Sequence, residues 1–342
     1  MALPASGAIS LNAVNVELGL SGTSTISMNQ SNLRTLFGVG SGGISMSNGH
    51  GKSSQFQLSK TLTSNIQNYN LRNDLIANGY AGSGPFTVNL TIASGVYIWS
   101  DSTSTAGFDT GSLSGGTINI TNNGFILGKG GNGGISQGNG GVGGLAMSIS
   151  QSVNITNNSY IAGGGGGGNG GFFNMQASGY AGGGGGAGGG VGGSSSGLNG
   201  TTSTGAGGSI GVKGTDSSGP NSFNRGGAGG GRILPGAGGT STGNLGSNVN
   251  TGGGAGGAGG LSFGFRMQSG WRPAGFCTGG GGGGWGAAGG NRVNGTSNTG
   301  AGGAGGGVGG NSAGGGAGGN AIQLNGNSVT WNATGTVYGA TS

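Results

Sequence analysis

The chain has 342 residues, of which 101 are glycine, and charged residues make up only 5% of it. Its 11 Lys and Arg residues outnumber its 5 Asp and Glu residues, and the resulting net charge of +6 reflects scarce acids rather than basic clusters. Because glycine has no side chain to bury and loses the most backbone entropy on folding, this composition excludes an ordinary helical or parallel-sheet core in residues 128–320.

Residues 1–60 contain a short repeat that predicts a small α-helical module. The units Ile9–Asn12 and Ile26–Asn29 lead into helical patterns, which Gly19 and Gly38 close, and a third unit starts at Ile44. Helices of two turns are not stable alone in water, so we expect this module to fold and dock against neighbours, either its own repeats or another chain. The expected docking residues are Leu11, Val14, Leu18, Leu33, Leu36 and Phe37.

The sequence does not show the pattern of a secretory signal or of a membrane span. Residues 1–20 carry no Lys or Arg, and no run approaches 18 apolar residues, so we expect neither a secretory signal nor membrane insertion. A lone Cys277 cannot form an internal disulfide.

Residues 61–127 combine one predicted helix with strand-like alternation. Ser64 can cap a helix that ends at Asn78 and Gly79. Pairs of short β-branched strands follow, each joined by an Asn or Gly turn. The pairs lie at residues 88–99, 118–126, 153–161 and 322–331. Since they occur before, inside and after the glycine-rich region, they predict a short β framework from which glycine tracts loop out and return.

The glycine tracts have a period of three residues. Lys129, Asn132 and Ile135, for example, are each separated by Gly-Gly. Three residues per turn is the period of polyproline II, the conformation called polyglycine II in glycine chains, and it predicts a bundle of about eight to ten such helices. Collagen is excluded because only five prolines are present. A flexible Gly/Ser-rich linker remains the alternative.

The predicted fold class is therefore mainly irregular and β, with a polyglycine II helix bundle on a short β framework and a small α-helical module before it. The expected domains are the module at 1–60, a helix-and-strand domain at 61–127, the glycine bundle at 128–320 and closing strands at 321–342.

Segments between the glycine tracts carry aromatic residues and arginines. Such residues on loops of a rigid scaffold are typical of a recognition surface, although small hydrophobic caps on the bundle would have the same composition. The candidate recognition residues are Phe172, Phe173, Tyr180, Phe223, Arg225, Phe263, Phe265, Arg266, Trp271, Arg272 and Phe276.

Motifs for catalysis, cofactors and nucleic acid are weak. The G-x-G-x-x-G matches follow from glycine content, and only Arg225 starts an RGG triplet. His50 and Cys277 lack the partners of a metal or catalytic site, and a loop explains Asp101 and Asp109. We therefore expect no enzyme activity, no cofactor, no metal and no nucleic-acid partner.

The sequence resembles proteins of tailed bacteriophages. Residues 1–12 and Glu17-Leu18-Gly19 look like the start of many tail proteins, and Trp331–Gly339 is similar to their ends. Region 128–320 is similar in design to the tip adhesins of T-even phage long tail fibres. This resemblance implies a layered polyglycine II sandwich whose loops bind outer-membrane receptors.

Composition and resemblance together predict a virion tail fibre or tail-tip adhesin, made in the host cytoplasm without a signal peptide. We expect it to dock on the virion through residues 1–60 and to bind its receptor through the candidate recognition residues. Its expected partners are other phage tail proteins and a bacterial surface receptor, either an outer-membrane protein or a surface glycan. Whether the chain forms a homotrimer stays open. The alternatives are a purely structural plug or spacer of the tail and, more remotely, an antifreeze protein like those of springtails.

Overall fold

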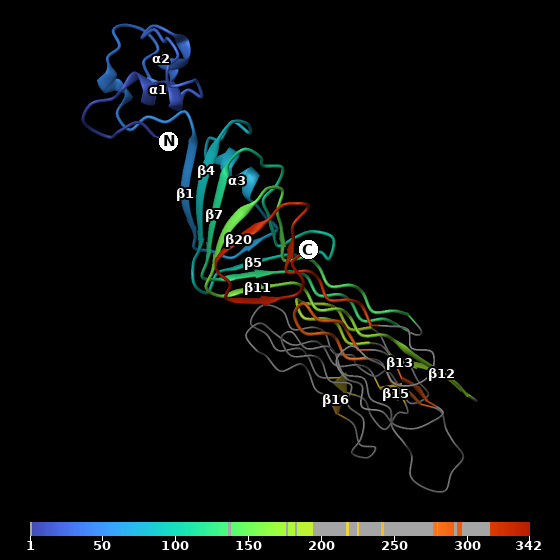
Figure 1. The fold of residues 1–342 in the computed structure, drawn as a ribbon. Helices are drawn as coiled ribbons and strands as arrows, with labels where there is room; N and C mark the ends of the chain where they lie inside the picture. Colours follow the sequence, from blue (N-terminus) through green and yellow to red (C-terminus); the bar gives the residue numbers. More distant parts are fainter. Residues whose placement is uncertain are drawn as a thin grey trace.

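The computed structural model describes part of the chain. The described residues are 2–135, 138–175, 177–181, 183–193, 217–218, 224–225, 241–242, 276–278, 280–290, 293–295 and 315–342. Figure 1 shows a small helical module at one end, parallel sheets next to it and the described glycine-rich segments beyond the sheets.

The N-terminal module consists of three short helices around a small core. They are α1 (Leu11–Glu17), α2 (Ser31–Phe37) and the 3-10 helix η1 (Met46–Gly49). The Ser10 side chain caps α1 by accepting a hydrogen bond of 3.0 Å from the Ala13 amide, and Gly38 ends α2 with a φ of 70°. Neither seven-residue helix would persist alone, so the shared core stabilises both. That core contains Leu3, Val14, Leu33, Leu36 and Phe37.

Three parallel sheets follow. The first contains β1 (Phe56–Leu62), β4 (Phe86–Ile92), β7 (Thr117–Asn122), β10 (Val153–Asn157) and β20 (Val329–Ala333). The second contains β2 (Ile66–Gln67), β5 (Tyr97–Trp99), β8 (Phe125–Leu127), β11 (Tyr160–Ala162) and β21 (Thr336–Tyr338). The third contains β3 (Tyr69–Asn70), β6 (Phe108–Asp109), β9 (Met147–Ser148) and β19 (Ile322–Gln323).

The chain visits these sheets in a fixed order and so winds into a solenoid. One coil runs through β1, β2 and β3, the next through β4, β5 and β6, and the third through β7, β8 and β9. The fourth coil runs through β10 and β11 and reaches the third sheet only at β19, before β20 and β21 close the stack.

Equivalent apolar residues of successive coils fill the solenoid. Leu90 pairs with Ile120, which pairs with Ile155, and all three are at most 1% exposed. Each buried aliphatic side chain of this kind contributes roughly 1.5–3 kcal/mol. Helix α3 (Leu71–Ala77) adds the buried Leu71 and Leu75 to the same core.

The predicted fold class is wrong. Three parallel sheets of four or five strands dominate the described fold, and no polyglycine II bundle is found in the described residues. The exclusion of a parallel-sheet core from residues 128–320 also fails, because β9, β10 and β11 lie inside that range. Composition does not reveal these strands, because each is only two to five residues long and the segments between them are rich in glycine.

The predicted helix from Ser64 to Asn78 is correct only in its second half. Residues before Leu71 form β2 and β3 instead, and α3 ends at Ala77. Tyr69 explains the difference, because its ring is buried in the solenoid core and packs in a tilted arrangement against that of Phe108, with the ring centroids 5.2 Å apart. Tertiary burial therefore overrides the local helical pattern.

The glycine-rich segments leave the solenoid from one corner, between the second and third sheets. The segment that crosses this corner becomes longer from coil to coil. It is the single residue Asn68 in the first coil, residues 100–107 in the second, residues 128–146 in the third and residues 163–321 in the fourth. The described glycine segments are thus extensions of successive coils.

Neighbouring glycine segments bond to one another through their backbones. Gly131 N donates to Gly165 O at 2.8 Å, and Gly316 N donates to Gly167 O at 2.8 Å. The approach is so close that a Cβ on Gly166 would lie 1.8 Å from Gly316 O. Glycine is therefore required where the backbones meet.

Candidate functional site

Short strands gather at the end of the glycine region. β12 (Gly171–Met175) pairs antiparallel with β13 (Ala177–Ala181), while β17 (Phe276–Thr278) pairs with β15 (Asn224–Arg225) and β18 (Val293–Gly295). We call these five the distal strands. β12 lies against β17 and β18, and β13 lies against β15. A further parallel pair joins β14 (Ser217–Ser218) to β16 (Ser241–Thr242).

Five of the predicted receptor-binding residues lie on the distal strands. Phe172 is the register partner of Tyr180, and Phe173 that of Gly179. Arg225 pairs with Thr278, which is two residues after Phe276 in β17. Figure 1 places β12, β13 and β15 at the end of the molecule remote from α1 and α2. The other six predicted residues, Phe223, Phe263, Phe265, Arg266, Trp271 and Arg272, lie outside the described residues.

Most of the predicted docking residues form the core of the module itself. Val14, Leu33, Leu36 and Phe37 are 0–8% exposed, and Leu18 packs against them. Leu11, by contrast, is 52% exposed.

Two further exposed apolar residues of the module were missed by the sequence reasoning. Val16 is 56% exposed and Leu20 is 39% exposed. Helical spacing could have identified Val16, because it is two residues from the buried Val14 and so lies on another face of α1.

Glu17 fixes the module to the segment that leads into β1. Its Oε1 accepts hydrogen bonds from Ser53 Oγ at 2.7 Å and from the Ser54 amide at 2.8 Å, and its carbonyl accepts one from Ser54 Oγ. Burial alone would raise the pKa of Glu17, but hydrogen bonds, first that of Ser53, hold it below the ordinary 4.5.

A second polar cluster fixes α3 to the solenoid. Asp74 accepts a hydrogen bond of 2.7 Å from Tyr69 OH and forms an ion pair of 2.5 Å with Lys60. Burial, followed by the bond to the Asp74 carboxylate, raises the pKa of the Tyr69 phenol far above its usual range. The cluster joins β1, β3 and α3, which is a structural role.

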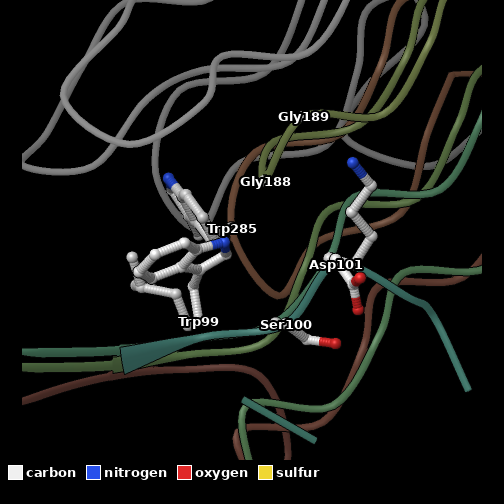
Figure 2. Close-up of a pocket in the computed structure, with 9 residues that line it drawn as sticks. Trp99, Ser100, Asp101, Gly188, Gly189 and Trp285 are labelled. Atoms are coloured by element: carbon white, nitrogen blue, oxygen red, sulfur yellow. The ribbon is translucent and has the colours of Figure 1, made fainter. Parts of the chain in front are cut away.

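A pocket of about 310 Å³ lies where the solenoid meets the glycine segments. The ends of β5 and β8 supply Trp99 and Leu127, and the residues that follow supply Asp101 and Lys129. Figure 2 shows Trp99 and Trp285 together on one side, Asp101 on the other, and Gly188 and Gly189 across from the strand ends. Sequence reasoning assigned Asp101 to a loop and did not single out this pocket.

The described residues offer neither a membrane-spanning helix nor a cluster of metal ligands. None of the described helices is both long and apolar enough to span a membrane. Within the same residues, no three His, Cys, Asp or Glu side chains come together as a metal site would require.

Comparison with known proteins identifies one family. Residues 57–249, more than half of the chain, match the family model described as phage tail fibre adhesin Gp38. The resemblance to phage tail fibre adhesins inferred from the sequence is thereby confirmed. The chain is also similar to the crystal structure of the gp37-gp38 adhesin tip complex of the bacteriophage S16 long tail fibre, with 19% identity, a TM-score of 0.41, and coverage of 99% of this chain and 100% of that one. Among curated proteins, none matches.

Proposed function

Because this chain belongs to the phage tail fibre adhesin Gp38 family, we propose that it binds a receptor on the host surface through its distal strands while its N-terminal module holds it on the tail fibre. An adhesin must present a contact surface away from its point of attachment. The distal strands and the helical module lie at opposite ends of the molecule, which supports this division of labour.

The observation that carries the proposal is the grouping of aromatic residues and an arginine on the distal strands. Phe172 and Tyr180 are register partners, and β13 lies against β15, which holds Arg225. Aromatic residues and arginine are enriched at the centres of protein interfaces, where few residues supply most of the binding energy. Because the glycine segments are joined by backbone hydrogen bonds, substitutions on the distal strands would leave the solenoid core undisturbed.

Adsorption of phage to host cells tests the distal strands. Phages that carry Phe172→Ser with Tyr180→Ser should adsorb at least tenfold more slowly, because losing two aromatic contacts of an interface costs more than about 1.4 kcal/mol. As a control, Thr61→Ala with Thr330→Ala changes two exposed residues of the first sheet and should adsorb normally. Unchanged adsorption of the Phe172/Tyr180 variant would instead favour a purely structural role in the tail.

Docking through the module rests on its exposed apolar side chains. Leu11, Val16 and Leu20 remain exposed although the module has a core of its own. We infer that another tail protein covers these three side chains. They replace the buried Val14, Leu33, Leu36 and Phe37 as the proposed docking residues.

Incorporation into particles tests this docking surface. Leu11→Glu with Val16→Glu should leave the module folded, since both residues are more than half exposed, but should reduce the amount of this protein in purified virions more than tenfold. Ile76→Glu is the matched control, because Ile76 on α3 is 41% exposed and belongs to the solenoid. Normal incorporation of the Leu11/Val16 variant would contradict the assignment.

A further inference from the structure

The pocket between the solenoid and the glycine segments has an aromatic floor. Trp99 and Leu127 are register partners on β5 and β8, and both pack with Trp285 and Ala187 on the second sheet. Trp285 is 2% exposed, whereas Trp99 is only half buried and so presents part of its indole to the pocket. A flat apolar surface therefore faces a space that the described side chains leave open.

Opposite charges stand beside this floor. Asp101 follows β5 by two residues, and Lys129 follows β8 by two residues. Asp101 Oδ1 accepts a hydrogen bond of 2.8 Å from Asn68, while its Oδ2 has no partner among the described residues. Within the described part of the chain, the Lys129 ammonium likewise forms neither an ion pair nor a hydrogen bond.

Backbone closes the remaining side of the pocket. Gly188 and Gly189 have φ values of 98° and 79°, and a Cβ on Gly188 would lie 2.5 Å from Gly128 O. Glycine is thus needed at this turn, and Gly188 O accepts a hydrogen bond of 3.0 Å from Gly130 N. The wall is held in place by the same backbone bonding that joins the glycine segments.

These groups select one class of ligand, and we propose that the pocket binds a neutral hexose ring of a glycan. A carboxylate only accepts hydrogen bonds and an ammonium only donates them, so a ligand that satisfies both needs donors as well as acceptors, and a hydroxyl combines the two in one group. A purely apolar ligand would desolvate the two charges without compensation, and a ligand with a net charge of either sign would be repelled by Asp101 or by Lys129. One face of a hexose ring is apolar and fits the Trp99 indole. A volume of about 310 Å³ accommodates one such ring.

This site is separate from the distal strands, and its test does not require the proposed receptor function to be correct. Saturation-transfer NMR on the full-length chain would use methyl α-D-glucopyranoside, methyl α-D-galactopyranoside and N-acetylglucosamine as probes. We expect at least one to bind with a Kd in the millimolar range, as the small number of contacting atoms allows.

Four variants locate the binding. Trp99→Ala and Asp101→Asn should each weaken it at least tenfold. Asp101→Asn keeps an oxygen that can accept from Asn68, so it remains informative if Trp99→Ala fails to fold. Lys129→Met should weaken binding as well, whereas Lys52→Met, in the N-terminal module, should not change it.

Two outcomes would overturn the proposal. One is the absence of saturation transfer from all three probes at concentrations up to roughly 50 mM, which lies beyond the expected range of Kd. The other is binding that Trp99→Ala and Asp101→Asn leave unchanged. The Phe172→Ser/Tyr180→Ser variant should keep its sugar binding, so a failure of the receptor proposal is distinguishable from a failure of this one.

Discussion

Among single residues, Glu17 has a role that its position in a short helix does not suggest. It is 5% exposed, and its carboxylate bonds to Ser53 and Ser54, just before β1 begins. Sequence reasoning treated residues 12–18 only as a helical pattern with apolar docking residues. Nothing in that pattern indicates that a carboxylate at its end would bond to residues 36 and 37 positions later in the chain.

This carboxylate should make the module sensitive to acid. The folded-state pKa of Glu17 is below 4.5, so its contribution to stability is present above the unfolded pKa and is lost as the pH falls through the folded value. Glu17→Gln should destabilise the module by about 1–3 kcal/mol at neutral pH, because it replaces bonds to a charged acceptor. Hydrogen exchange of the α1 and α2 amides between neutral pH and about pH 3 measures both effects. If low pH destabilises the module of the Glu17→Gln protein as much as that of the unmodified protein, the result would contradict this role of Glu17.

At the scale of elements, the sequence predicts strands better than it predicts their assembly. The similarity of residues 118–126 to residues 153–161 predicts two equivalent strand pairs, and the structure places Asn119 beside Asn154 and Ile120 beside Ile155. The third sheet could not be predicted in this way, because strands such as Tyr69–Asn70 and Met147–Ser148 are too short to show alternation.

The sequence also indicated one of the two candidate sites but not the other. Aromatic residues between glycine tracts indicated Phe172 and Tyr180, and the structure places them on paired strands. The pocket was not predictable, because Trp99, Lys129 and Trp285 are brought together by the corner of the solenoid and by the return of a distant glycine segment. Their separation along the chain carries no local signal.

Glycine segments also provide a test at this scale. Gly166→Ala would place a Cβ 1.8 Å from Gly316 O, so the segments around residues 166 and 316 must move apart. Overpacking of this kind costs about 1–3 kcal/mol or more, because the clash is with backbone. Thermal unfolding should occur at a lower temperature, with faster exchange of amides in residues 163–170.

Gly40→Ala is the control for this substitution. A Cβ there meets nothing within 4 Å, so the variant should unfold at the temperature of the unmodified protein. If Gly166→Ala and Gly40→Ala unfold alike, the close packing of the glycine segments is not what stabilises them.

At the scale of the whole molecule, the solenoid separates the end proposed for attachment from the end proposed for binding. Its main core contains residues of all three sheets and of α3, and from the described glycine segments it contains only their last residues, Ala146 and Ala321. The described glycine segments contribute instead Ala187 and Trp285 to a second cluster on the second sheet. Changes at the far end should therefore leave the solenoid folded.

Removing the longest glycine extension tests that independence. The same corner is spanned by residues 100–107 in the second coil, so a copy of these eight residues should connect β11 to β19 in place of residues 163–321. We expect this shortened chain to unfold cooperatively when heated, because the register of β10 with β20 and of β11 with β21 does not involve the removed residues. Its unfolding temperature should be lower, since Trp99, Leu127 and Tyr338 lose the packing of Trp285. Circular dichroism during heating measures both properties. A shortened chain that shows no cooperative transition would mean that the glycine segments hold the solenoid together rather than extend from it.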